Sequence, residues 1–137
     1  VFYYFFNMLV LVSLKAAGDS ISPDEQKVSG KEGVSVKLRC TYETSSENVR
    51  LYWYRHHLNQ APQFILYKGA RSWSSEHISD RRYQSTTSRT STELTVTQLT
   101  LADTALYYCA LENTRHCGCT CQCSTVYSLG PAFLIPR

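Results

Sequence analysis

The side chains in this sequence with the widest chemical scope are its cysteines and histidines. Six cysteines and four histidines occur among 137 residues. Two of the cysteines stand far apart, whereas the other four alternate with other residues in one short run: Cys117, Cys119, Cys121 and Cys123. Thiols pair as disulfides in an oxidising compartment, or bind soft metal ions as thiolates. The isolated pair and the run therefore need separate explanations.

The run of alternating cysteines has the spacing of metal clusters more than that of single structural zinc sites. In a secreted chain, oxidation to disulfides would compete with metal binding. Metal ligation and unspecific disulfide pairing both stay open for this run. We expect neither a metal nor any other cofactor to be part of the function.

The histidines do not form a catalytic pattern. His56 and His57 are adjacent, so on a strand they would point to opposite faces and could not chelate one ion together. His77 and His116 fall in a predicted loop and in the tail. No nucleophile-elbow, phosphate-loop or zinc-peptidase spacing occurs. We therefore expect that the chain is not an enzyme.

Length and charge limit the classes of protein to which this chain can belong. A chain of 137 residues accommodates one ordinary domain with tails and can bury a core. Charged residues make up 18% and the net charge is +3, a mild and scattered balance that gives no reason to expect nucleic acid as a partner. We interpret the charged residues as an ordinary solvated surface.

The first 18 residues resemble a secretory leader. Residues 1–14 are almost wholly apolar, and the small residues Ala16, Ala17 and Gly18 follow at suitable cleavage positions. The apolar run is shorter than the roughly 20 residues that a membrane span needs. No initiator methionine or basic region precedes it, so we interpret residues 1–18 as a truncated signal peptide. No later stretch is apolar enough to anchor the chain.

The remaining sequence has the period of β-strands. Between residues 34 and 42, apolar side chains alternate with polar ones, which predicts a half-buried strand carrying Cys40 inward. Further short β-prone segments lie at 51–55, 63–67, 82–88 and 91–99, separated by polar turns. No helical period occurs beyond the leader. This pattern predicts an all-β sandwich of two sheets.

Two longer segments resemble a known family. The stretch from Trp53 to Tyr67 resembles the strand-turn-strand segment of antigen-receptor variable domains, and the stretch from Leu94 to Leu111, with Asp103 and Tyr107-Tyr108-Cys109, resembles their third framework region. The chain is thus identified as a member of the immunoglobulin variable-type superfamily over residues 19–111. Within it, the sequence is more similar to T-cell receptor alpha or delta variable segments than to antibody light chains.

The resemblance implies which residues stabilise the fold. It implies a disulfide between Cys40 and Cys109, which would close a loop of about 70 residues and contribute on the order of 4 kcal/mol. It also implies an ion pair between Arg82 and Asp103 and a tyrosine corner at Tyr107. The expected core residues are Trp53, Tyr107, Leu94 and Val96.

The resemblance also implies where recognition occurs. The hypervariable loops would be residues 44–50, residues 68–75 and the segment that begins after Cys109, all at one end of the sandwich. Aromatic and cationic side chains in such loops are of the types enriched in binding hot spots. The candidate antigen contacts are Ser46, Asn48, Arg50, Lys68, Arg71, Trp73 and Glu112.

A second predicted surface pairs this chain with another variable domain. An outward cluster of aromatic residues and proline on a sheet would otherwise be an exposed apolar patch. The candidate interface residues are Tyr54, His56, Ala61, Pro62, Phe64 and Tyr108. His56 stands where the family usually has a glutamine, which predicts that pairing is sensitive to pH.

The end of the chain departs from the family. No aromatic-Gly-x-Gly signature follows Leu111, and residues 130–137 come nearest without matching it. We therefore expect the final strand to be missing or irregular, and residues 112–137 to lie outside the domain as a poorly ordered tail. An unjoined germline segment, translated past its recombination boundary, is the favoured explanation for the tail and its cysteines.

Together these features predict the antigen-recognition variable domain of a T-cell receptor alpha-type chain. Its partners would be the variable domain of a beta-type or gamma-type chain and a peptide presented by MHC. It would act at the outer side of the plasma membrane, after passage through the secretory pathway, anchored by a constant region absent here. The alternatives are a non-rearranging immune-type receptor and an antibody light-chain variable domain.

Overall fold

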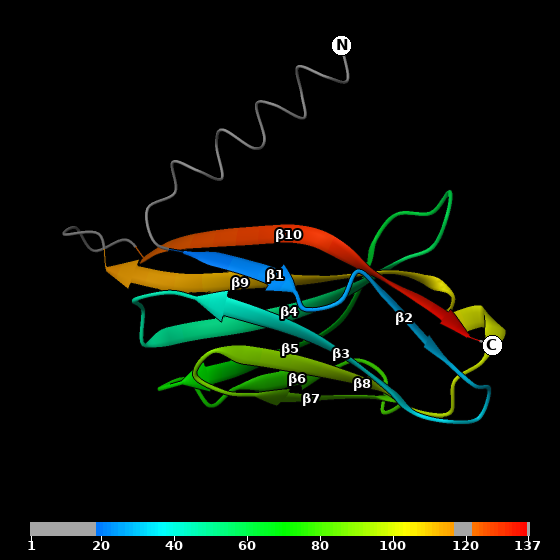
Figure 1. The fold of residues 1–137 in the computed structure, drawn as a ribbon. Helices are drawn as coiled ribbons and strands as arrows, with labels where there is room; N and C mark the ends of the chain where they lie inside the picture. The colour runs from blue at the N-terminus through cyan, green and yellow to red at the C-terminus, as the bar shows by residue number, and fades with distance from the viewer. Residues whose placement is uncertain (1–18, 117–121, 137) are drawn as a thin grey trace, which may run out of the picture.

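The computed structural model describes residues 19–116 and 122–136, with side chains described for residues 19–113. Two β-sheets lie face to face (Figure 1). The elements in chain order are β1 Ser20–Pro23, β2 Lys27–Gly30, β3 Val36–Glu43, β4 Asn48–His56, β5 Gln63–Arg71, β6 Glu76–Ile78, β7 Tyr83–Thr87, β8 Ser91–Val96, the 3-10 helix η1 Leu101–Asp103, β9 Ala105–His116 and β10 Gln122–Pro136. The predicted all-β sandwich is confirmed.

The first sheet has four antiparallel strands in the order β1-β3-β8-β7. Alternate residues of β3 are buried, as the period of two in the sequence predicted. The same holds for β8, where Leu94 lies opposite Leu38 and Val96 opposite Val36. Each strand therefore contributes every second side chain to the core.

The second sheet has six strands in the order β2-β10-β9-β4-β5-β6. On β4, Val49, Leu51 and Trp53 are buried, while the residues between them are only partly covered. Trp53 lies opposite Cys109 of β9 and Leu66 of β5. The pairing of β4 with β9 and β5 thus places the tryptophan in the middle of the sheet, and its burial shows that it faces inward.

The centre of the sandwich is the bridge between Cys40 and Cys109, whose Cα atoms lie 6.6 Å apart. Trp53 is fully buried, and its indole Nε1 donates a hydrogen bond to Thr92 Oγ1 at 3.2 Å. Because a buried indole N–H needs an acceptor, this bond allows the ring to fill the core. The other predicted core residues, Tyr107, Leu94 and Val96, are buried as well.

One end of the sandwich is held by Asp103. Arg82 Nη2 donates to Asp103 Oδ2 at 2.7 Å, and the hydroxyl of Tyr107 donates to the Asp103 carbonyl at 2.9 Å. Burial alone would raise the pKa of Asp103, but the Arg82 guanidinium and hydrogen bonds from Thr100 outweigh it, so this pKa lies below its ordinary value. Burial raises the pKa of the Tyr107 hydroxyl strongly. The ion pair and the tyrosine corner are both present.

The prediction that the final strand is missing is wrong. Strand β10 pairs antiparallel with β9 and parallel with β2. Figure 1 shows β10 running beside β9. The prediction of irregularity is correct, because the register shifts between Ser128 and Pro131. Backbone hydrogen bonding needs no particular side chain, so the β-prone residues of 122–136 extend the sheet without the expected glycine signature. Proline lacks an N–H, and Pro131 lies at that interruption.

The same strands correct the predicted domain boundary. Residues 112–116 continue β9 and residues 122–136 form β10, so both segments belong to the second sheet rather than to a tail outside the domain. The predicted signal peptide and residues 117–121 of the cysteine run lie outside the described residues. In the part of the chain that is described, no helix is long and apolar enough to cross a membrane.

Candidate recognition and pairing surfaces

The outward face of the six-stranded sheet carries a row of large polar and aromatic side chains. Since Val49, Leu51 and Trp53 point inward, the residues between them on β4, Arg50, Tyr52 and Tyr54, point outward. Across the strand ladders they meet Glu112 and Tyr108 of β9 and Phe64 and Tyr67 of β5. This sheet therefore buries one face and presents another that is neither fully apolar nor fully charged.

Four of these rings form a continuous group with His77 of β6, and we call the five the aromatic face: Tyr52, Tyr54, Phe64, Tyr67 and His77. Phe64 is its centre, with ring centroids 6.1 Å from Tyr54, 6.4 Å from Tyr67 and 5.9 Å from His77. Tyr52 lies 6.3 Å from Tyr54 and 5.5 Å from Tyr67. Phe64 remains 37% exposed. Such separations are typical of packed aromatic pairs, so the group is organised before any partner binds.

Burial within this group raises the pKa of the Tyr54 hydroxyl. Burial also raises the pKa of Tyr52, and its hydrogen bond to Glu112 acts in the same direction. Both hydroxyls therefore stay protonated at physiological pH, and that of Tyr52 donates a hydrogen bond to Glu112.

His56 lies at the next outward position of β4, beside Tyr108 of β9. The two ring centroids are 6.1 Å apart. His56 Nδ1 is buried, and no described residue offers it a hydrogen-bond partner. Ala61 and Pro62 lie in the exposed turn between β4 and β5. The structure thus brings four of the six predicted interface residues onto one sheet face and leaves Ala61 and Pro62 beside it.

The sequence prediction missed three rings of the aromatic face. Tyr52 stands two residues before Tyr54, so the period of two would have placed it on the same face. Tyr67 was hidden by an irregularity: the register between β4 and β5 shifts between Trp53 and Tyr54, and both Ile65 and Leu66 are buried. The shift turns Tyr67 outward, next to His77 of β6.

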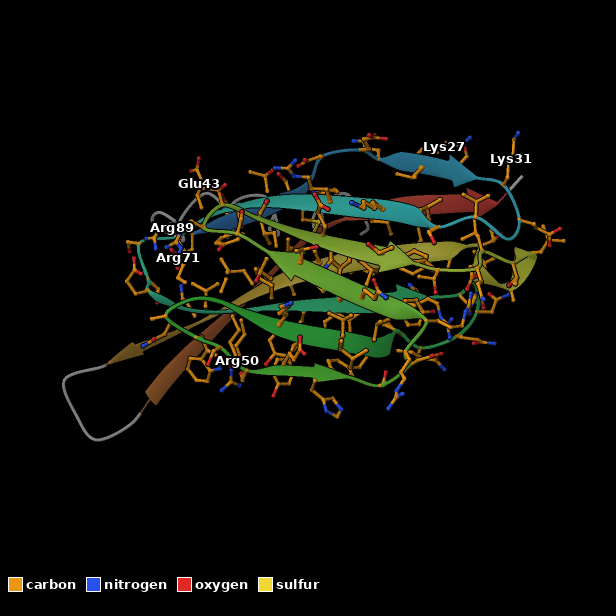
Figure 2. All side chains as sticks on the ribbon, turned by 90° about the horizontal axis from the view of Figure 1, so that it is seen from below. Lys27, Lys31, Glu43, Arg50, Arg71 and Arg89 are labelled. Atoms are coloured by element: carbon orange, nitrogen blue, oxygen red, sulfur yellow. A yellow bond between two sulfur atoms is a disulfide. The ribbon has the colours of Figure 1, made fainter. Side chains whose placement is uncertain are left out.

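The opposite end of the sandwich from Asp103 is formed by short connections, at residues 44–47, 72–75 and 88–90. Figure 2 shows Arg71 beside Arg89 at this end, with Lys27 and Lys31 at the other. Arg71 Nη1 donates to the carbonyls of Thr44 at 2.7 Å and Ser46 at 2.6 Å, and Nη2 donates to the Arg89 carbonyl at 2.8 Å. One guanidinium therefore links two connections.

Arg71 also has a left-handed backbone, with φ of 62°. This conformation is uncommon for a residue with a side chain and ends β5 in a sharp turn. The guanidinium lies 5.4 Å from the ring centroid of Tyr42. These contacts give Arg71 a structural role, in addition to the predicted role as an antigen contact.

The other predicted antigen contacts are also engaged within the chain. Ser46 Oγ donates to the Asn48 carbonyl at 3.1 Å, and Ser72 Oγ donates to Asn48 Oδ1 at 2.9 Å. Lys68 Nζ donates to the Ser85 carbonyl at 3.0 Å and lies 3.6 Å from Glu76. Arg50 pairs with Glu112 at 3.7 Å.

Strand bounds differ from the predicted loops at this end. Asn48 and Arg50 belong to β4, Lys68 and Arg71 to β5, and Glu112 to β9. Pairing with neighbouring strands extends each of these strands further than the polar composition suggested, because backbone hydrogen bonds do not require apolar side chains. Of the seven candidates, only Ser46 and Trp73 lie in connections. Antigen contact by these residues stays a prediction.

Metal-binding geometry does not arise among residues 19–113, whose side chains are described. No group of three or more His, Cys, Asp or Glu side chains there could hold a metal ion. His56 lies against Tyr108 and His77 against Phe64 and Tyr67, so each of these two rings packs in an aromatic contact.

Comparison with known proteins agrees with the architecture. A family model described as immunoglobulin V-set domain matches residues 23–118. The chain therefore belongs to the immunoglobulin V-set family. The match extends past Cys109 into the segment that continues β9.

Within this family, the chain is similar to T-cell receptor alpha variable regions. It is 35% identical over 108 residues to T-cell receptor alpha chain V region CTL-F3 of Mus musculus, covering 77% of this chain and 79% of the relative. It is 32% identical over 107 residues to T cell receptor alpha variable 18 of Homo sapiens, covering 77% and 92%. The domain is thus a variable domain of the T-cell receptor type, as the sequence predicted.

The fold also resembles a solved structure. A chain from a structure titled "Structural basis of T cell specificity and activation by the bacterial superantigen toxic shock syndrome toxin-1" superposes with a TM-score of 0.70. The alignment covers 88% of this chain and all of the other, at 21% identity. At this identity the likeness concerns the fold alone.

Proposed function

We propose that this chain is the antigen-recognition variable domain of a T-cell receptor alpha-type chain. In this proposal it pairs with the variable domain of a beta-type chain, or a gamma-type chain if it serves as a delta chain, and the pair binds a peptide presented by MHC. The observation that carries the proposal is the aromatic face, whose rings pack against one another but leave Phe64 37% exposed.

The aromatic face is suited to a protein partner. Aromatic side chains are enriched at the centre of protein interfaces, and an uncovered group of them on a secreted domain favours association. His56 and Tyr108 extend this face along β4 and β9, with ring centroids 6.1 Å apart. A second variable domain covers such a face economically.

The connections at residues 44–47 and 72–75 support recognition at one end of the sandwich. Hydrogen bonds from Arg71 and Ser72 hold the first connection in a defined shape. A surface held in place before binding loses less conformational freedom on binding. Antigen would then contact what these loops expose, together with the segment between β9 and β10.

We also propose where the chain acts and that its role is binding. The chain would enter the secretory pathway and act outside the plasma membrane within a receptor complex, held there by a constant region. We propose a binding role without enzymatic activity. A non-rearranging immune-type receptor is the second candidate, favoured by strand β10, which completes the sheet without the joining-segment signature.

Pairing is tested by coexpression with a beta-type variable domain, followed by size-exclusion chromatography and calorimetry. We expect a one-to-one complex, and we expect Phe64→Glu to weaken it by at least about tenfold, since a charge would be buried at the interface. The matched control is Gln84→Glu, which adds a charge to an exposed position of β7 in the other sheet. Failure of the wild type to pair would contradict the proposal.

The two candidate receptor classes are separated by sequencing transcripts that contain residues 20–111. A joining segment followed by a constant region is expected for the T-cell receptor. Splicing of the present exon directly to a membrane anchor would instead select the non-rearranging receptor.

A further inference from the structure

Arg50 lies where three elements meet on the outward side of the six-stranded sheet. On β4 it stands opposite Gly69 of β5 and Glu112 of β9. Its guanidinium carbon is 4.0 Å from the ring centroid of Trp73, and Nη1 is 3.7 Å from Glu112 Oε2. One side chain therefore contacts both the connection at residues 72–75 and the strand β9.

Trp73 can lie on the sheet because Gly69 has no side chain. A Cβ added at Gly69 would come within 2.7 Å of Trp73 Cδ1 and 2.6 Å of the Trp73 carbonyl oxygen. The indole contacts the Gly69 backbone and the guanidinium of Arg50, and its Nε1 donates to Ser75 Oγ. Stacking on a guanidinium is a planar contact that lysine cannot reproduce.

Glu112 is the carboxylate that faces the guanidinium of Arg50. The Tyr52 hydroxyl donates to Glu112 Oε2, the same oxygen that faces Arg50. The side chains of Arg50 and Glu112 are 31% and 15% exposed, so solvent screens their attraction less than it screens an exposed pair. The contacts run in sequence from Tyr52 to Glu112, to Arg50 and to Trp73.

The backbone of the same connection is held elsewhere. Ser72 N–H donates to the Glu47 carbonyl at 3.1 Å, and Trp73 N–H donates to the Ala70 carbonyl at 3.1 Å. These bonds hold the path of the chain but leave the indole dependent on Gly69, Ser75 and Arg50. Of these three neighbours, Arg50 is the one that also contacts β9.

We propose that Arg50 is a positioning residue that makes the placement of Trp73 depend on the side chain at position 112. Position 112 lies on β9, four residues before that strand ends at His116. A substitution there alters the carboxylate that holds Arg50, and thereby the indole in the connection at residues 72–75. The consequence for antigen binding rests on the proposed function, whereas the coupling is a property of the unbound chain.

The test measures hydrogen exchange in the full chain by NMR, at the Trp73 indole N–H and at the Ser72 and Trp73 amides. We expect Glu112→Ala and Arg50→Met each to accelerate exchange of the indole about two- to fivefold, as expected for loss of a cation–π contact of about 0.5–1 kcal/mol. In the double variant, exchange should be no faster than in Arg50→Met alone. Arg50→Lys should accelerate exchange less than Arg50→Met.

Two further variants keep the test specific. Lys68→Met removes an ion pair of similar length from the neighbouring strand, Lys68 to Glu76 at 3.6 Å, and should leave Trp73 exchange unchanged. Glu112→Gln keeps the side-chain volume if Glu112→Ala folds poorly, and the Trp53 indole in the core reports whether each variant is folded.

Wild-type exchange at Trp73 in both Glu112 variants would overturn the proposal. So would an equal acceleration by Glu112→Ala in the Arg50→Met background, because the effect would then not pass through Arg50. Neither measurement involves a partner chain or an antigen. Failure of the coupling would therefore leave the proposed pairing untouched, and failure of pairing would leave the coupling intact.

Discussion

Two arginine–carboxylate pairs at opposite ends of the sandwich differ in how firmly they are held. At one end, Arg82 lies 2.7 Å from Asp103, whose side chain is 1% exposed. Toward the other end, Arg50 lies 3.7 Å from Glu112, which is 15% exposed. The Asp103 carboxylate also accepts a hydrogen bond from the Thr100 amide, and the Asp103 backbone carbonyl accepts one from the Tyr107 hydroxyl. The Glu112 carboxylate shares its cation with two aromatic rings.

The difference separates stability from recognition. The Asp103 end and the disulfide bury their polar groups in fixed partnerships, so substitutions there act on folding of the whole domain. The end that carries the connections uses half-exposed contacts, which substitutions rearrange at a smaller cost.

Replacing Cys40 and Cys109 together by alanine should lower the free energy of unfolding by about 4 kcal/mol, because the bridge closes a loop with a sequence separation of 69 residues. The measurement is urea denaturation followed by tryptophan fluorescence. An unchanged denaturation midpoint would show that the bridge does not stabilise the domain.

Replacing Asp103 by alanine should cost about 2–3 kcal/mol, because Arg82 and the Thr100 amide lose their partner while Arg82 remains partly solvated. The pH dependence follows from the lowered pKa of Asp103. A carboxyl group with a lowered pKa stabilises the folded state above its unfolded pKa of about 4, and this stabilisation is lost as the pH falls through the lower folded value.

The difference in unfolding free energy between wild type and Asp103→Asn should therefore be constant from pH 7 down to about pH 4 and shrink below it. Denaturation curves recorded at several pH values give this difference directly. A difference that grows on acidification would reverse the assigned sign.

Replacing Arg71 by alanine should cost about 1–2 kcal/mol, since the carbonyls of Thr44, Ser46 and Arg89 lose a charged donor. The matched control is Arg39→Ala, whose ion pair with Asp24 spans 3.4 Å between exposed side chains and should contribute less than about 1 kcal/mol. Equal losses in the two variants would mean that Arg71 does not organise the connections.

The core could be predicted from the sequence because its signals are local. The alternation around Leu38 and Cys40 determines which side chains turn inward, and the spacing of Trp53 and Cys109 is typical of one architecture. The ion pair of Arg82 with Asp103 joins residues within the segment that resembles the family. Local period and family resemblance agree at each of these positions.

The outer surfaces could be predicted only in part. Tyr67 points outward because of a register shift between β4 and β5, which the sequence of a single strand does not reveal. Trp73 packs on the sheet because Gly69, opposite Arg50 on the neighbouring strand, has no side chain. The final strand escaped prediction because β10 is held by backbone pairing with β9 and β2, and its side-chain signature differs from that of the family. Such features depend on contacts between strands rather than on the order of residues.

The proposed pairing surface is the outward face of the six-stranded sheet. Hydroxyl-radical footprinting of the chain with and without a beta-type variable domain tests it most directly. We predict lower oxidation of Tyr54, Phe64 and Tyr108 in the complex, and unchanged oxidation of the exposed Leu58 and Leu101. Protection of Leu58 and Leu101 with no protection of Tyr54 and Phe64 would contradict the claim.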